Sequence, residues 1–308
     1  MVKDRGGSGA CCAVVGAVPR WGHPARRSAP AGFHRSPDRD TPAGSVGVVN
    51  PRAQARPRRR WPVVVAVIVA ALLGYGAGVV QPIVRRAPLM VGQDAVVDGV
   101  PAGSTRVFIA DAGGRVLVIE PTDRPATTAF VFYPGGLVRP QAYEWLGHAL
   151  AERGVRTLIP EFPADLAVID ADRAETVAAS LAPDLPVVVG GHSLGGVMAA
   201  RYASQHADAV AGLVLMAAYP EDGIDLTGAT FAAVVLQAGE DGRAAPTLVD
   251  AAADRLPPGT RTEVIDGAAH SFFGRYGAQA GDGVPTVSRA HAEAAIRDAL
   301  DRFFAALA

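Results

Sequence analysis

The feature that most constrains the fold of this chain is an abrupt change of pattern at a single serine. The β-branched run Pro186-Val-Val-Val189 leads directly into Gly191-His-Ser-Leu-Gly195, and the Ala-rich segment 194–205 follows without a gap. Glycines on both sides of the serine allow a very tight turn between the strand and the helix, with the serine exposed at its tip. The pattern Gly-x-Ser-x-Gly is common by chance, but in this context it predicts a nucleophilic serine, Ser193. The N-terminus of the following helix also favours negative charge there.

Strand and helix patterns alternate on both sides of this turn, from about residue 91 to the C-terminus. The expected strands cover 106–110, 115–120, 127–133, 155–159, 185–190, 210–216, 231–237 and 262–265. The expected helices cover 141–153, 171–181, 194–205 and a C-terminal segment with Ile296, Leu300, Phe303 and Leu307 on one stripe. The first two strands flank Ala112-Gly-Gly114, which is typical of a hairpin. Alternation of this kind predicts an α/β protein with a mostly parallel sheet and helices on both faces.

Charge is distributed unevenly along the 308 residues. Residues 1–60 contain 12 Lys and Arg against 3 Asp and Glu, whereas the remaining 248 residues contain 17 against 27. The acidic body argues against nucleic-acid binding, which needs a basic face on a folded domain. The basic arm 1–60 shows no sustained period, so we expect it to be disordered. The two cysteines, Cys11 and Cys12, lie in this arm, which excludes a disulfide framework or a cysteine-based metal site in the body.

An uncharged run of 24 residues, Trp61–Val84, separates the arm from the body. About 20 apolar residues cross a bilayer as a helix. Five arginines lie between residues 52 and 60, so the positive-inside rule predicts a cytoplasmic N-terminus and an exported body, residues 85–308. We therefore expect a single-pass signal anchor in the cell membrane. The alternative is a signal peptide cleaved near Gly74-Tyr-Gly76, which would release the body as a secreted protein.

Chain order selects the histidine that would work with Ser193. On a turn of this kind the acid and then the histidine follow the serine in the chain. No acid lies between Ser193 and His206, so His206 fails this test. His291 belongs to the C-terminal helical segment, where we expect a surface position. His270 stands in a small-residue loop directly after the strand 262–265 and is the expected base.

The acid is expected in the turn after the strand 231–237, which reads Glu240-Asp-Gly242. Both carboxylates are candidates, and we prefer Asp241 because it is shorter and adjoins a turn glycine. Its expected role is to hold the correct tautomer of His270 and to stabilise the imidazolium that forms.

Two backbone N–H groups are expected to stabilise an oxyanion. The N–H of Leu194, directly after the serine, is the first. The second is expected in the loop Tyr133-Pro-Gly-Gly-Leu137, where glycines allow the backbone to approach a substrate oxygen closely. We expect it to be the N–H of Gly136, with Leu137 as the alternative.

Together these residues resemble the α/β-hydrolase superfamily over roughly 200 residues. The resemblance rests on Tyr133-Pro-Gly-Gly136, Gly191-His-Ser-Leu-Gly-Gly196, Glu240-Asp-Gly242, His270-Ser-Phe-Phe-Gly-Arg-Tyr-Gly277 and Gly281-Asp-Gly283. Similar motifs occur in a group of small, lidless bacterial hydrolases, which tends to have Gly-Asn where this chain has Ala268-Ala269. The resemblance implies the α/β-hydrolase fold and hydrolase chemistry, and it implies little about the substrate.

The connection between the strands 210–216 and 231–237 is short. Residues 217–230 show no helical period, so a large cap domain does not fit there. We expect minimal or no cap and a shallow pocket, roofed in part by Tyr219, Leu226 and the pair Phe272-Phe273.

We therefore expect an exported serine hydrolase that cleaves small-molecule carboxylic esters through an acyl-enzyme, without a metal or organic cofactor. An acyltransferase would use the same three side chains with an alcohol as acceptor, and the sequence does not separate the two. A non-catalytic binding module on this scaffold would require a broken triad, whereas all three candidate residues are present. The sequence carries no signal for an oligomeric state.

Overall fold

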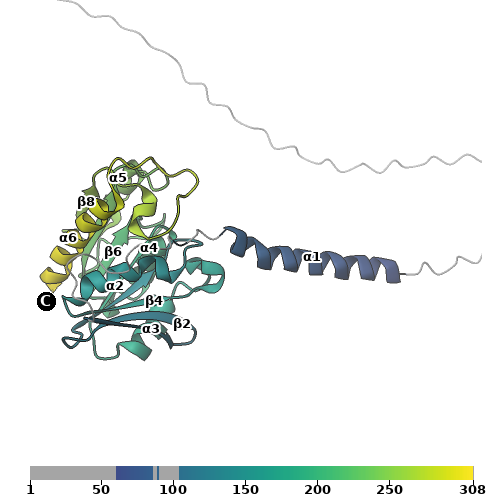
Figure 1. The fold of residues 1–308 in the computed structure, drawn as a ribbon, viewed down its shortest axis with the longest axis horizontal. Helices are drawn as coiled ribbons and strands as arrows, with labels where there is room; N and C mark the ends of the chain where they lie inside the picture. The colour runs from purple at the N-terminus through teal and green to yellow at the C-terminus, as the bar shows by residue number, and fades with distance from the viewer. Residues whose placement is uncertain (1–59, 86–88, 90–103, 308) are drawn as a thin grey trace, which may run out of the picture. The chain divides into compact units, whose positions relative to one another are not determined.

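The structure is a computed structural model that describes residues 60–85, 89 and 104–307 (Figure 1). The arm expected to be disordered lies outside the described residues, apart from Arg60. The body is described without a gap from residue 104 to residue 307, which includes all the expected strands.

The body is built around one sheet of eight strands in the order β1-β2-β4-β3-β5-β6-β7-β8. β1 and β2 form the expected antiparallel hairpin, β2 is antiparallel to β4, and the other neighbours are parallel. The strands are β1 Thr105–Asp111, β2 Arg115–Pro121, β3 Thr128–Tyr133, β4 Val155–Pro160, β5 Val187–His192, β6 Gly212–Met216, β7 Ala232–Ala238 and β8 Arg261–Ile265. The predicted mostly parallel sheet is confirmed.

Five α-helices accompany this sheet in the described part of the body: α2 Glu144–Ala151, α3 Arg173–Leu181, α4 Leu194–Gln205, α5 Pro246–Ala251 and α6 Arg289–Leu307. Short 3₁₀ helices cover Pro140–Tyr143, Pro163–Asp165, Ala167–Ile169, Ala207–Ala209, Ala253–Arg255 and His270–Phe273. The expected helix 141–153 is divided into a 3₁₀ turn and the shorter α2. α5 was not expected, because its six residues are too few to show a helical period.

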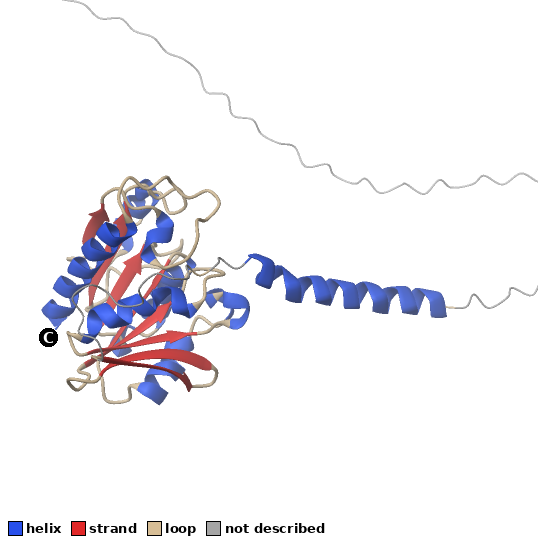
Figure 2. Ribbon diagram, viewed as in Figure 1, coloured by secondary structure: helices blue, strands red, loops and turns tan. Residues whose placement is uncertain are grey.

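The helices cover both faces of the sheet (Figure 2). Successive side chains of a strand point to opposite faces, so the neighbours Val188 and Val189 belong to two different cores. One core contains side chains of α2 and α6, and the other contains side chains of α3, α4 and α5. The predicted stripe of α6 is buried at Ile296, Leu300 and Phe303, with Leu307 packed against the same core.

The short connection between β6 and β7 carries no cap domain. Residues 217–231 form turns and bends without a helix or strand, which confirms the expected minimal cap. The expected apolar roof is wrong for Leu226 and Phe273, because both side chains are buried in the two cores. Tyr219 and Phe272 are half-buried at the edges of those cores.

The uncharged run forms the helix α1, Trp61–Arg85. Its segment Trp61–Gly78 is long and apolar enough to cross a membrane, and none of that segment is buried within the structure. At 1.5 Å per residue the 18 residues extend over about 27 Å, close to the thickness of a hydrocarbon core. This exposure argues against a core helix of the body, whereas a membrane anchor and a signal sequence share these properties.

Candidate active site

Strained backbone marks one edge of the sheet. Among the residues that the structure describes, five non-glycine residues have a positive φ, between 45° and 62°: Leu137, Ala164, Asp165, Ser193 and Ala217. They lie in the connections that follow β3, β4, β5 and β6, which are neighbours in the sheet. Strained conformations persist where the surrounding structure imposes them, and they cluster at functional sites. The candidate site therefore lies at the carboxyl ends of these four strands.

Ser193 occupies the turn between β5 and α4. Its backbone has φ 53° and ψ −126°, and its N–H donates a hydrogen bond to the carbonyl oxygen of Met216 in β6 (2.9 Å). Ser193 is half-buried, so part of this residue is exposed to solvent. The predicted sharp turn is thus present, with the serine at its tip.

Three glycines make this turn possible. A Cβ atom on Gly191 would lie 2.5 Å from the carbonyl carbon of Gly195. A Cβ atom on Gly195 would overlap the carbonyl oxygens of Tyr133 and Pro134, and one on Gly196 would overlap the side chain of Ala218. Helix α4 can therefore start against the end of β3 only because these positions lack side chains.

The structure brings Asp241 and His270 together. The Nδ1 atom of His270 lies 2.8 Å from Oδ2 of Asp241, and both side chains are almost completely buried. The other carboxylate oxygen of Asp241, Oδ1, accepts hydrogen bonds from the N–H groups of Arg243 and Ala244, both at 2.7 Å. Glu240, the alternative acid, is exposed to solvent.

Two opposing effects set the pKa of Asp241. Burial raises the pKa of this carboxyl group, but the hydrogen bond and charge of His270 and the two backbone N–H groups outweigh burial. The net result is a pKa below the ordinary value, so the carboxylate is ionised at neutral pH. An ionised Asp241 accepts the Nδ1–H proton of His270 and leaves Nε2 of the ring as the basic atom.

His270 lies beside the serine turn. Its ring centroid is 4.5 Å from that of His192, the residue before Ser193. Within the described chain, Nε2 of His270 is buried and has no hydrogen-bond partner, so the Ser193 hydroxyl does not bond to it in this structure. Catalytic hydrogen bonds of this type are often long in the absence of substrate.

The N–H groups of the loop after β3 differ in their partners. The N–H of Gly135 donates to the hydroxyl oxygen of Tyr143 (3.0 Å), and the N–H of Leu137 donates to the carbonyl oxygen of Asp165 (2.8 Å). The N–H of Gly136 has no acceptor in the part of the chain that the structure describes. Leu137, the alternative oxyanion donor, is therefore already occupied, whereas Gly136 is available.

Leu194 and Gly136 are neighbours in space. A Cβ atom on Gly136 would lie 3.2 Å from Cδ2 of Leu194. Leu194 is the first residue of α4, and the first N–H groups of a helix have no partner within the helix. The two residues that carry the expected donors therefore lie next to each other.

A buried relay that the sequence did not suggest connects the two halves of this site. The Tyr143 hydroxyl accepts the N–H of Gly135 and forms a second hydrogen bond with Nδ1 of His192 (2.8 Å). Burial, and next the nearby His270, lower the pKa of His192 well below 6.5, so its ring is neutral. A Cβ atom on Gly135 would lie 2.8 Å from this nitrogen, so a glycine is required there. The relay thus links the loop after β3 to His192, the residue before Ser193.

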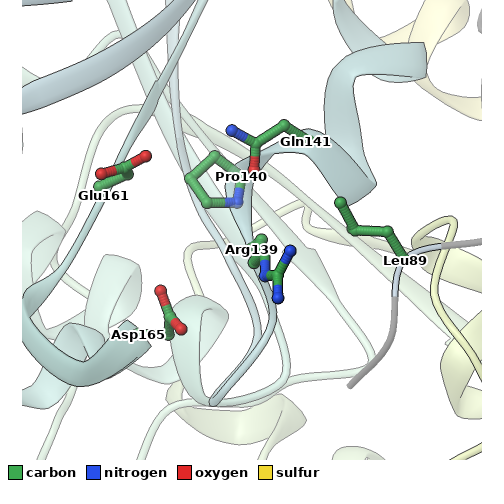
Figure 3. A pocket seen from close by; sticks show the side chains of 6 residues that line it. All are labelled: Leu89, Arg139, Pro140, Gln141, Glu161 and Asp165. Atoms are coloured by element: carbon green, nitrogen blue, oxygen red, sulfur yellow. The ribbon is translucent and has the colours of Figure 1, made fainter. Parts of the chain in front are cut away.

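A polar pocket of about 400 Å³ lies beside the loop after β3 (Figure 3). Its described lining comes from the segments after β3 and β4, together with Leu89: Arg139, Pro140, Gln141, Glu161 and Asp165. Figure 3 shows the charged ends of Arg139, Glu161 and Asp165 grouped around this space. The described lining of this pocket is therefore mostly polar, and Ser193, Asp241 and His270 are not part of it.

Comparison with known proteins agrees with the fold described above. The model of the alpha/beta hydrolase family matches residues 129–294, more than half of the chain. The chain belongs to the alpha/beta hydrolase family. A solved structure, that of a predicted CIB-like hydrolase from Thermoplasma acidophilum, is similar to this alpha/beta hydrolase with a TM-score of 0.51 at 17% identity. The similarity covers 65% of this chain and 98% of the other and concerns the fold alone. No curated protein matches the sequence significantly.

The family assignment and the site together support hydrolase activity. In this alpha/beta hydrolase the family match begins in β3 and covers the loop after it, the turn at Ser193, and the segments with Asp241 and His270. The sequence alone gave no role to Tyr143, which lies within the expected helix 141–153, or to His192. Their partners lie 8 and 49 residues away along the chain, so no local pattern signals the contact.

Proposed function

We propose that this alpha/beta hydrolase is a serine hydrolase that cleaves carboxylic esters of small molecules. The observation that carries the proposal is the buried Asp241–His270 pair beside the strained turn of Ser193. A serine hydroxyl is a weak nucleophile by itself and needs an adjacent base that a third group orients. The pair supplies such a base, and its free Nε2 atom is the one that would take the proton.

In the proposed first step, His270 Nε2 removes the proton of the Ser193 hydroxyl as its oxygen attacks the ester carbonyl carbon. The N–H groups of Leu194 and Gly136 bind the oxygen that becomes negative, and the ionised Asp241 stabilises the imidazolium of His270. The imidazolium then protonates the leaving alkoxide, which departs as an alcohol and leaves an acyl-serine. Water repeats the sequence on the acyl-serine, releasing the carboxylic acid and restoring the hydroxyl group.

The test of this function uses the full chain in detergent with a chain-length panel of aryl esters. We expect saturable hydrolysis and covalent labelling by a fluorophosphonate, with the modification mapped to Ser193 by mass spectrometry. Added alcohols distinguish hydrolysis from acyl transfer, because a transferase would form a new ester in preference to the acid. Labelling at another residue, or ester hydrolysis that complete labelling of Ser193 does not stop, would contradict the proposal.

We further propose that α1 anchors the enzyme in the cell membrane with the body outside the cytoplasm. The unburied apolar segment Trp61–Gly78 and the arginines before it support this orientation. Protease added to intact spheroplasts should digest the body, and the body should sediment with membranes. A body that is protected until lysis would overturn the orientation, and a body found in the medium would favour signal cleavage.

A further inference from the structure

Asp282 holds the backbone of the proposed base. The N–H of His270 donates a hydrogen bond to Oδ1 of Asp282, and the N–H of Ser271 donates to Oδ2, both at 2.9 Å. These two residues begin the 3₁₀ helix His270–Phe273, and Ala269 before it provides no side-chain cap. A carboxylate 12 residues further along the chain therefore satisfies the first N–H groups of this helix.

The segment around Asp282 also packs directly on the turn that carries Asp241. A Cβ atom on Gly283 would overlap the carbonyl oxygen of Glu240, and one on Gly242 would lie 2.9 Å from the nitrogen of Gly283. Backbone thus touches backbone, with no side chain between the two segments. We call residues 280–283 the strap.

A side-chain bond reinforces this contact. Nη1 of Arg243 donates a hydrogen bond to the carbonyl oxygen of Ala280 in the strap (2.7 Å). The N–H of Arg243 is also one of the two donors to Asp241. The strap therefore contacts the turn of Asp241 on one side and the helix of His270 on the other.

We propose that Asp282 is a positioning residue, which fixes the ring of His270 against Asp241 by holding the backbone of His270 to the strap. The inference rests on the proposed function, because it concerns the base of that reaction. Asp241 follows β7 and His270 follows β8, so their separation depends on two independent loops. A misplacement of about 1 Å in such a site costs about 100-fold in rate.

The test compares Asp282→Ala with a matched control, Asp111→Ala, in the full chain in detergent. Oδ1 of Asp111 also accepts two backbone N–H groups, those of Gly113 and Gly114 (3.1 and 3.0 Å). Asp111 is the last residue of β1, at the opposite end of the sheet order from β8. The control therefore removes a similar pair of hydrogen bonds far from His270.

Two measurements are made on each variant. The first is kcat and KM for an aryl ester, and the second is the downfield proton resonance of His270 Nδ1–H in ¹⁵N-histidine-labelled protein, assigned by its loss in His270→Gln. We expect Asp282→Ala to lower kcat by about 10- to 100-fold with KM changed less than about threefold, and to shift or broaden the resonance. Asp111→Ala should leave kcat, KM and the resonance unchanged.

A second variant keeps the test valid if Asp282→Ala does not fold. In Asp282→Asn the amide oxygen can accept one of the two N–H groups, so we expect a smaller change in the same direction. Wild-type kcat and resonance in a folded Asp282 variant would overturn the proposal and leave Asp282 a structural cap only. The resonance does not depend on ester cleavage, so a shifted resonance in a chain without esterase activity would refute the proposed function and retain the positioning role.

Discussion

Ser193→Ala is expected to lower kcat for an aryl ester by about 10⁴- to 10⁶-fold, the loss known for the nucleophile of serine proteases. Alanine has no hydroxyl group to attack the carbonyl carbon, whereas the N–H groups of Leu194 and Gly136 stay in place. Alanine and serine meet similar backbone strain at a φ of 53°, so the variant should fold normally. The measurement is steady-state kinetics, with thermal unfolding of both proteins as the check on folding.

The control for this variant is Ser204→Ala in the same helix. Ser204 lies in the last turn of α4, and its hydroxyl donates a hydrogen bond to the carbonyl oxygen of Arg201 (2.7 Å). Its loss should leave kcat within about twofold, since isolated surface substitutions have small effects. A Ser193→Ala enzyme that keeps more than about a tenth of the wild-type kcat would show that Ser193 is not the nucleophile.

The second large effect is expected from Asp241→Asn, which should lower kcat by about 10²- to 10⁴-fold. Two N–H groups, those of Arg243 and Ala244, point at Oδ1 of Asp241, so the amide oxygen of asparagine will take that position. The amide NH₂ group then faces Nδ1 of His270, where the carboxylate offered an acceptor. This reversal places the ring proton on Nε2 and prevents that nitrogen from accepting the proton of Ser193.

Glu240→Gln is the matched control for Asp241→Asn. Glu240 is exposed, so we expect less than about a tenfold effect on kcat and a change in unfolding free energy within about ±0.5 kcal/mol. The kinetics must be measured on folded protein. If Glu240→Gln proves severe and Asp241→Asn mild, the acid moves by one residue, and if neither matters the acid comes from the end of another strand.

Local patterns were sufficient for much of the fold. The strand preceding Ser193, the turn and the helix after it follow a pattern of about twenty residues, and the structure reproduces them. The steric need for glycine at Gly195 comes instead from Tyr133 and Pro134, which lie about 60 residues earlier in the chain. The C-terminal stripe at Ile296, Leu300 and Phe303 was likewise visible as a helical period. The short helix α5 was missed, because six residues carry too little periodicity.

The candidate site could be predicted only in part, because some of its contacts join segments that are far apart in the chain. The motif around the turn was enough to nominate Ser193, chain order then selected His270, and the turn after the strand 231–237 offered Asp241 and Glu240 as acids. The sequence did not show that the N–H of Leu137 is occupied by a carbonyl group 28 residues away, or that Gly136 therefore remains available. The expected apolar roof was also wrong at Leu226 and Phe273, because the burial of a side chain depends on which elements pack around it.

The alternation of strands and helices, the tight turn at Ser193 and the candidate chemical groups could thus be predicted from the sequence. These depend on side-chain periodicity and on backbone sterics, which act over a few residues. The Tyr143–His192 relay, the free N–H of Gly136 and the hydrogen bonds of Asp282 to the His270 helix could be identified only from the tertiary structure. Each of these joins segments that are far apart in the chain, and a hydrogen bond forms only when the fold brings its donor and acceptor within about 3 Å.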